Sequence, residues 1–137
     1  MKINGDTVFE TSYNLPKPHK SPGINILLVE PFSCLRQASR YFNTYQSSVA
    51  ATELSTYLRQ VSQGVIIVGV TADDPTRRLA SALPALQQLG VDVSDVRFRG
   101  SFVFVAQKGF PAKTQLRKIL NRLIVDITGI IENSLTV

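Results

Sequence analysis

The sequence predicts a single domain of the α/β (α+β) class, with mixed parallel and antiparallel β-sheets in a sandwich-like arrangement, flanked by two to three helices. Of its 137 residues, 44% are hydrophobic and 18% are charged, which is enough apolar material for one core. Short apolar runs of strand length alternate with segments whose apolar residues recur at helical spacing. Because a helix between two strands often crosses the sheet and returns the chain in parallel, part of the sheet is expected to be parallel.

The first 22 residues predict a strand pair followed by a loop. Asn4-Gly5-Asp6 lies within residues 2–11 between short apolar stretches, and Asn-Gly favours a tight turn because both residues tolerate a positive φ. Three prolines follow between residues 14 and 23. Since proline lacks the donor that a sheet ladder needs, that segment is expected to be an extended loop.

Residues 23–110 carry the predicted core, which opens with a hairpin. The apolar run from Ile24 to Val29 has strand length, Pro31-Phe32-Ser33 marks a turn, and residues 35–45 predict the returning strand. The segment from Ser48 to Gly64 then predicts a helix, since its leucines recur at helical spacing.

The second half of this core predicts two buried strands around a helix. Val65 to Val70 is continuously apolar and, except for Gly69, β-branched, which is typical of a central strand buried on both faces. Asp73-Asp74-Pro75 indicates a turn and a helix start, and a helix over 81–89 with Pro84 in its first turn follows. Residues 101–106 predict another buried strand.

Residues 111–137 predict an extension of the same domain, made of a basic helix and a C-terminal strand. Apolar residues within 113–123 recur at helical spacing, and residues 123–131 are rich in isoleucine and valine. A terminal strand of this kind can add to the sheet edge of a partner. We therefore expect partner-binding residues in this extension, at Lys113, Arg117, Arg122, Ile124 and Ile127.

Charge and cysteine content restrict the classes of function. The net charge is +5 and Cys34 is the single cysteine, so an intramolecular disulfide is impossible and Cys34 is expected to be a partly buried turn residue. A nucleic-acid surface usually interleaves aromatic residues with its cations, whereas the densest basic set has only Phe110, so a solvated helix face is favoured and a nucleic-acid partner is not expected. That set is Lys108, Lys113, Arg117, Lys118 and Arg122.

Other functional classes find no support in the residues. The chain has no metal-ligand cluster, phosphate-binding loop or nucleophile motif, so neither an enzyme nor a bound metal or cofactor is expected. No apolar run approaches the roughly 20 residues of a membrane span, and the first residues lack the apolar core of a signal peptide. We expect a chain that is made and kept inside a cell, or one from which a signal has been removed.

A run of short motifs in fixed order resembles the ILEI/PANDER-like domain, also called the GG-type lectin domain. The resemblance covers about two-thirds of the chain and implies that family's fold. The motifs are Gly23-Ile24-Asn25, Phe42-Asn43-Thr44-Tyr45, the strand from Gly64 to Val70, Asp73-Asp74, Leu89-Gly90, Phe98-Arg99-Gly100-Ser101-Phe102 and Gln107-Lys108-Gly109.

The resemblance also implies a glycan site. Sugar-binding members use an arginine before the Gly-Ile start, the first acid after the central strand, and the arginine of the Arg-Asp-x-Trp motif; these positions fall on Pro22, Asp73 and Arg99. Asp and Arg supply the charge-assisted hydrogen bonds that hold sugars. The chain departs from the family pattern at Pro22, at Asn43 and Gly100, which replace aspartates, and at Phe102, which replaces a tryptophan.

Structural roles compete with this interpretation. Asp74 with Pro75 could simply start a helix, and Arg99 could pair with Asp73 or Asp95 to brace the strand ends. Phe42, Tyr45, Phe98 and Phe102 are expected to be core residues.

Two functions remain open at this point. The first is a structural or adaptor component of a larger assembly, for example a virus tail or baseplate, in contact with other protein subunits. The second is a carbohydrate-binding, lectin-like domain that recognises glycans containing GlcNAc or related sugars through Asp73 and Arg99.

Overall fold

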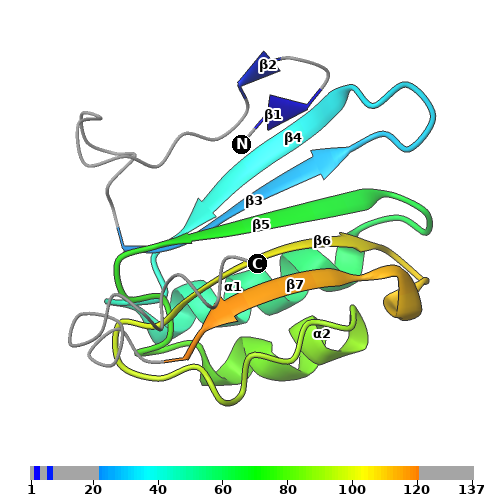
Figure 1. Cartoon of the computed structure of the whole chain (residues 1–137). Helices are drawn as coiled ribbons and strands as arrows, with labels where there is room; N and C mark the ends of the chain where they lie inside the picture. Colours follow the sequence, from blue (N-terminus) through cyan, green and yellow to red (C-terminus); the bar gives the residue numbers. More distant parts are fainter. Residues whose placement is uncertain (1, 4–5, 8–21, 121–137) are drawn as a thin grey trace, which may run out of the picture.

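The computed structural model describes residues 2–3, 6–7 and 22–120 (Figure 1). Within these ranges five strands form one sheet in the order β4-β3-β5-β6-β7, and two more pair separately as β1-β2. The elements are β1 (Lys2–Ile3), β2 (Asp6–Thr7), β3 (Gly23–Val29), β4 (Arg36–Phe42), α1 (Ser48–Gln60), β5 (Ile66–Ala72), the 3-10 turn η1 (Ala80–Ala82), α2 (Leu83–Gln88), β6 (Ser101–Gln107), the 3-10 turn η2 (Pro111–Lys113) and β7 (Gln115–Ile119).

The α+β class is confirmed, but the prediction of a mixed parallel sheet is wrong. Every neighbouring pair in the five-stranded sheet is antiparallel. The reason lies in the strand order. β4 and β5 both run antiparallel to β3, so the crossover helix α1 does join two parallel strands, but β3 lies between them. The sandwich-like arrangement is not found in the described part of the chain either, where helices pack on the sheet.

The predicted N-terminal strand pair is present, with Lys2 opposite Thr7 and Ile3 opposite Asp6. Most of the predicted proline-rich loop lies outside the described residues. The β3–β4 hairpin is also present, and Cys34 occupies its turn, partly buried and with a φ of 59°.

Helix α1 follows the predicted apolar spacing. The Ser47 hydroxyl accepts a hydrogen bond from the Ala50 amide at 3.2 Å and caps the first turn. Leu54 and Leu58 face the core and are almost completely buried. The helix ends at Gln60, before the predicted Gly64.

Strand β5 is the central strand, as predicted. Its apolar run is buried on both sides, since Ile67 faces the main core while Val68 faces the opposite surface of the sheet. Figure 1 shows both helices on the same side of the sheet. The main core therefore lies between the helices and one sheet face, and it contains Ile24, Phe42 and Phe104.

Helix α2 is short and is preceded by η1, with Pro84 in its first turn as predicted. No helix starts at Asp74-Pro75. The chain stays irregular up to Leu79, and η1 begins at Ala80. In the described part of the chain, no helix is long and apolar enough to cross a membrane.

The predicted basic helix over 113–123 is wrong for its described part, which forms η2 and the edge strand β7. Leu116 lies opposite Phe104 of β6 and packs against the main core, whereas the neighbouring Gln115 and Arg117 are exposed. Pairing with β6 thus overrides a local spacing that also fits a helix. The remainder of the predicted helix and the C-terminal strand lie outside the described residues.

Lys108 illustrates how a motif residue can act structurally. Its ammonium donates to the carbonyl oxygens of Leu58 (2.6 Å) and Arg59 (3.2 Å) at the end of α1, where cations complement unpaired carbonyls. The pKa of Lys108 is lowered mainly by burial of its ammonium group and, to a smaller extent, by the positive charge of Arg59. The lysine therefore fastens the end of β6 to the end of α1.

Replacing Lys108 with methionine is expected to lower the free energy of unfolding by about 1–2 kcal/mol, since two charge-assisted hydrogen bonds are lost while the aliphatic stem is kept. Urea denaturation measures the change. The matched control is Lys113→Met, which removes an exposed lysine that lies over the Phe110 ring. Equal stability of the two variants would contradict a capping role for Lys108.

Candidate functional site

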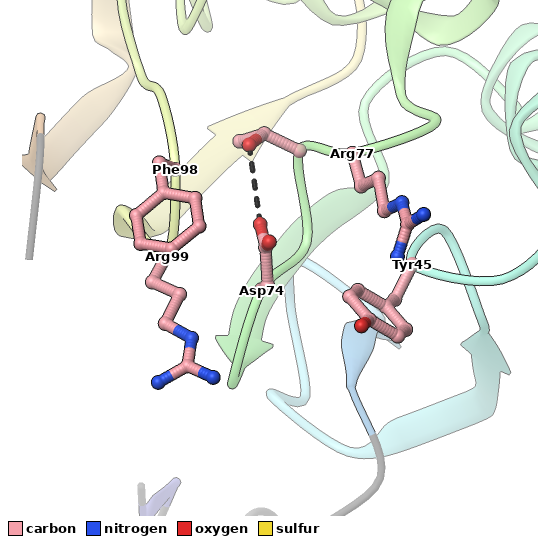
Figure 2. Close-up of a pocket in the computed structure, with 6 residues that line it drawn as sticks. Tyr45, Asp74, Arg77, Phe98 and Arg99 are labelled. Atoms are coloured by element: carbon pink, nitrogen blue, oxygen red, sulfur yellow. Dashed lines mark hydrogen bonds between the residues drawn. The ribbon is translucent and has the colours of Figure 1, made fainter.

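A hollow of about 330 Å³ opens at one end of the sheet (Figure 2). β4 and β5 end there and β6 begins there, because Phe42 pairs with the start of β3 and Ala72 pairs with Gly23. The lining residues come from the three segments that follow β4, follow β5 and precede β6. They are Tyr45, Asp74, Thr76, Arg77, Phe98 and Arg99.

The Phe42–Tyr45 motif builds one wall of the hollow. Phe42 is buried in the main core as predicted. The prediction that Tyr45 belongs to the core is wrong, since this residue is only partly buried and lines the hollow. Between them, the buried Thr44 hydroxyl donates to the carbonyl of Pro75 at 2.6 Å, and the Thr44 carbonyl accepts from the Arg78 amide at 2.9 Å. These two bonds fix the loop after β5 beside the loop after β4.

Asp73 and Asp74 follow β5 and have different environments. Asp73 is exposed and has a φ of 54°, a left-handed conformation that aspartate tolerates better than most residues. Asp74 is 7% exposed and lines the hollow. Its carboxylate accepts a hydrogen bond from the Thr76 hydroxyl at 3.3 Å, the bond that Figure 2 shows as a dashed line. Asp74 therefore holds the loop and presents a carboxylate to the hollow.

Phe98 and Arg99 stand on a tight turn before β6. The Gly100 amide donates to the Arg97 carbonyl at 2.6 Å, and Arg99 has a φ of 54°. A left-handed conformation costs a residue with a side chain about 1–2 kcal/mol, and such local strain is more frequent at functional sites. Phe98 is 54% exposed, so the prediction that it belongs to the core is wrong.

The other predicted core aromatic of this motif, Phe102, is buried and stacks on Phe104 with ring centroids 6.4 Å apart. The Thr71 hydroxyl bonds both the amide and the carbonyl of Phe102, each at 3.0 Å. The end of β5 is thereby tied to the start of β6, immediately after the Phe98–Arg99 turn.

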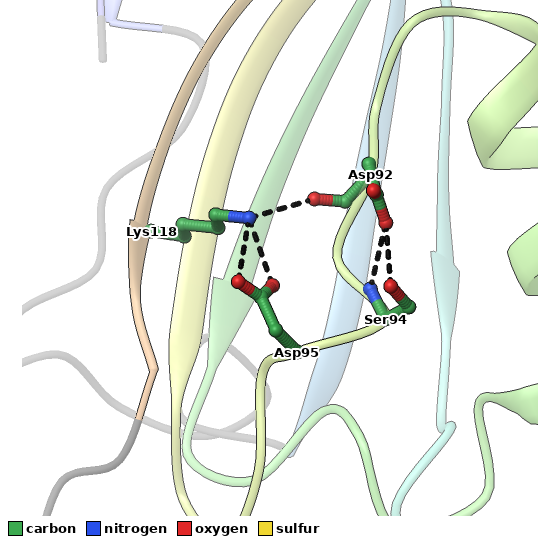
Figure 3. Close-up of polar contacts among 4 residues, drawn as sticks. All are labelled: Asp92, Ser94, Asp95 and Lys118. Carbon is green, nitrogen blue, oxygen red and sulfur yellow. Dashed lines mark hydrogen bonds and ion pairs between the residues drawn. The ribbon is translucent and has the colours of Figure 1, made fainter.

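The loop between α2 and β6 is clamped to β7 (Figure 3). The Lys118 ammonium binds the Asp95 carboxylate at 2.8 and 3.0 Å and the Asp92 carbonyl at 3.1 Å. Hydrogen bonds from the Ser94 hydroxyl and amide lower the pKa of Asp92. The Arg97 amide donates to the Leu120 carbonyl at 2.7 Å. These contacts position the turn that carries Phe98 and Arg99.

The guanidinium groups in the hollow lie over aromatic rings. The Arg77 Cζ is 5.1 Å from the Tyr45 ring centroid, and the Arg99 Cζ is 5.7 Å from that of Phe98. Asp95 pairs with Lys118, and within residues 22–120 Arg99 has no ion pair. Two guanidinium forks, one carboxylate and two aromatic rings therefore converge on one hollow. This set can donate and accept several hydrogen bonds to a polar ligand.

The positions implied by the resemblance lie at or beside this hollow. Arg99 lines it, whereas Asp73 is exposed next to the lining residue Asp74. The Pro22 carbonyl accepts a hydrogen bond from the Tyr41 hydroxyl. Five lining residues were not predicted as site residues: Tyr45, Asp74, Phe98, Thr76 and Arg77. The first three belong to quoted motifs, but no signal in the sequence marks Thr76 or Arg77.

The predicted partner-binding residues are only partly described. Lys113 and Arg117 are both exposed, on η2 and β7, while Arg122, Ile124 and Ile127 lie outside the described residues. Among the residues that the structure does describe, no group of His, Cys, Asp and Glu could hold a metal ion.

Comparison with known proteins gives the family. A comparison with curated proteins found no match. The family model "Interleukin-like EMT inducer" (ILEI) matches residues 22–110, more than half of the chain, and this range contains every residue that lines the hollow. The ILEI-like domain is not a known enzyme family. The chain therefore belongs to the interleukin-like EMT inducer (ILEI) family.

Proposed function

We propose that this domain binds a carbohydrate in the hollow at the end of the sheet. The convergence of Arg77, Arg99 and Asp74 beside two aromatic rings is the observation that carries the proposal. Sugars present several hydroxyl groups that act as donors and acceptors, together with apolar C–H faces. A concave site with a few charged groups and aromatic walls matches both features.

The individual residues can be given roles in this proposal. Arg99 donates hydrogen bonds to ring hydroxyls or to a substituent, and the carboxylate of Asp74 or of the exposed Asp73 accepts from hydroxyls. The Asp74 carboxylate can accept further hydrogen bonds, because the one from Thr76 leaves other lone pairs of its oxygens unused. Tyr45 and Phe98 offer ring edges and the uncovered parts of their faces to C–H groups.

A glycan array followed by calorimetric titration with a β-linked GlcNAc disaccharide tests the proposal. Arg99→Gln is expected to weaken binding at least about tenfold, which corresponds to about 1.4 kcal/mol, without changing the melting temperature. Asp73→Asn and Asp74→Asn compare the two acids. The matched control is Arg36→Gln, which removes an exposed arginine at the hairpin end of β4, opposite the hollow. Absence of binding across the array would refute the proposal.

We also propose a second candidate function, a structural or adaptor role in an assembly, which the β3–β4 turn favours. Phe32 is 95% exposed and Leu35 is 65% exposed at its tip. The Glu30 carboxylate accepts from the amides of Phe32 and Ser33 and from the Ser33 hydroxyl. These hydrogen bonds lower the pKa of Glu30, and the bond from the Ser33 hydroxyl has the largest effect. A rigid turn that presents an exposed aromatic residue suits a contact with another protein.

The Phe32→Ser and Leu35→Ser double variant tests this second role. If the turn mediates assembly, light scattering of the unchanged chain should show an oligomer at high concentration, and the variant should remain monomeric with unchanged glycan binding. Lys113→Gln with Arg117→Gln tests the predicted partner-binding surface in the same way. If the unchanged chain stays monomeric at all concentrations and no other subunit co-purifies with it, this result would count against the structural or adaptor role.

A further inference from the structure

The two arginines of the hollow have no acidic partner among the described residues. The ion pairs found within residues 22–120 join Arg40 to Glu53 and Lys118 to Asp95, and none of these four residues lines the hollow. Arg77 and Arg99 are both exposed. Asp74 is the lining acid, and its carboxylate is buried and bonded to Thr76. In Figure 2 the two arginines lie on either side of Asp74. The hollow therefore offers two guanidinium groups, each a planar fork of N–H donors, whose positive charges are not paired with a carboxylate of the described residues.

Stacking has already oriented these forks. The guanidinium of Arg77 lies over Tyr45 and that of Arg99 over Phe98. A guanidinium held by its face keeps its N–H donors at the edge of the plane, where they can bind an anion in bidentate fashion. The same stacking covers part of each ring, so less aromatic surface remains for the C–H face of a sugar. Recognition here depends more on the arginines than on the rings.

The charge balance then indicates the ligand. A neutral sugar hydroxyl binds one N–H at a time and leaves the positive charge uncompensated when water is displaced, which is costly for a charged group. A carboxylate or a sulfate compensates the charge and matches the fork geometry. The exposed Asp73 stands near the hollow but makes no ion pair of 4.0 Å or less with either arginine, so the forks remain available.

We propose that the saccharide bound in this hollow is anionic, with carboxylate or sulfate groups held by Arg99 on one side of Asp74 and by Arg77 on the other. The inference rests on the proposed carbohydrate binding and adds the chemical class of the ligand. Asp74 then accepts hydrogen bonds from neighbouring hydroxyls, and it lies between the two arginines, where it disfavours an anionic group placed centrally. The acidic substituents are therefore expected at the edges of the saccharide rather than at its centre.

Titration of the full chain with three oligosaccharides of equal length tests the inference. One is neutral, one carries a uronic acid and one carries a sulfate. At low ionic strength, at least one acidic sugar is expected to bind about tenfold more tightly than the neutral sugar, and the preference should shrink as salt screens the charges. The uronic acid and sulfate arms show which anion is recognised.

Variants separate charge from geometry. Arg99→Gln and Arg77→Gln are each expected to weaken the preference for the acidic sugars, and the double variant to abolish it. Arg99→Lys should retain more of the preference than Arg99→Gln, because lysine keeps the charge but lacks the planar donor geometry of the guanidinium. Arg36→Gln should retain the full preference, and melting curves confirm that each variant is folded.

The outcomes are distinguishable. Equal, salt-independent binding of neutral and acidic sugars would overturn the anionic class and leave carbohydrate binding intact. Failure of all three sugars to bind would refute the carbohydrate proposal, and the inference with it. Competition by inorganic sulfate that is as strong as that by the acidic sugar would also overturn the inference, since the hollow would then recognise an anion without its saccharide.

Discussion

Replacing Phe104 with alanine is expected to lower the free energy of unfolding by about 3–5 kcal/mol, the usual cost of removing a buried phenyl ring. Phe104 is 1% exposed, stacks on Phe102 and lies opposite Gly69 in the β5–β6 pair. The ring fills the space above Gly69, where an added Cβ would collide with the ring atoms Cε1 and Cζ. Its loss leaves a cavity that the sheet and the helices cannot easily close.

This packing predicts a change of sign in a double-mutant cycle. In the unchanged chain, Gly69→Ala should cost about 1–3 kcal/mol because the new methyl group collides with the Phe104 ring. In the Phe104→Ala background the same methyl group enters the cavity, and alanine is also favoured over glycine in a strand by about 0.5–1 kcal/mol. Gly69→Ala should therefore stabilise that background.

Urea denaturation of the four proteins measures the coupling free energy. Val29→Ala is the control partner, because Val29 is buried on the opposite face of the sheet, and its cost should add to that of Gly69→Ala. If Gly69→Ala destabilised both backgrounds equally, the close contact between residues 69 and 104 would not exist.

The elements that could be predicted are those whose signal is local. β3, β5 and β6 appear in the sequence as apolar runs, and α1 appears as leucines at helical spacing, because in each case the buried face is determined within a few residues. Even the burial of β5 on both faces follows from its continuous apolar run, which is rich in β-branched residues. Such features need no knowledge of which strand lies beside which.

Strand pairing is not local, and the prediction failed where it decides the structure. Residues 115–119 could form a helix or a strand by spacing alone, and the unpaired edge of β6 selects the strand. The parallel sheet was inferred from crossover helices, and this inference could not anticipate that β3 would lie between β4 and β5. Both errors concern neighbours that are distant in the sequence.

The same distinction holds for the site. Arg99 was identified from a motif, whereas Arg77 is placed in the hollow by a loop conformation that depends on the bond from Thr44 to Pro75, 31 residues apart. Phe98 was predicted as core because its apolar character is visible, while the turn that points it outward depends on the Lys118 clamp and the bond from Arg97 to Leu120.

The two departures from the family motifs at aspartate positions are expected to differ sharply when reversed. Asn43→Asp should change the free energy of unfolding by no more than about 0.5 kcal/mol. The Oδ1 of the Asn43 side chain accepts a hydrogen bond from the backbone amide of Gln46 at 3.1 Å, and an aspartate keeps this bond. The Asn43 side-chain amide donates to the Gln46 side chain, which can rotate to present its own amide to a carboxylate.

Gly100→Asp should instead cost about 3–5 kcal/mol, because it combines overpacking with a buried charge. A Cβ at Gly100 would lie 2.5 Å from Val96 Cγ1 and 2.7 Å from the carbonyl oxygens of Arg97 and Ile119. Two of these three neighbours are backbone atoms that the β6–β7 pairing and the turn hold in place. Relief of the collision would have to move the Phe98–Arg99 turn, so sugar binding should be lost together with stability.

Gly100→Ala separates the two contributions, since it adds the colliding Cβ without the charge. Urea denaturation and sugar titration of all three variants are the measurements, and equal stability of Asn43→Asp and Gly100→Asp would disprove the contact. The expected difference has a physical basis. At residue 43 the side chain is partly exposed and either residue is accommodated. At residue 100 the close approach of β7 and the turn leaves room only for glycine. A return to aspartate at residue 100 would therefore require β7 to lie farther from this turn.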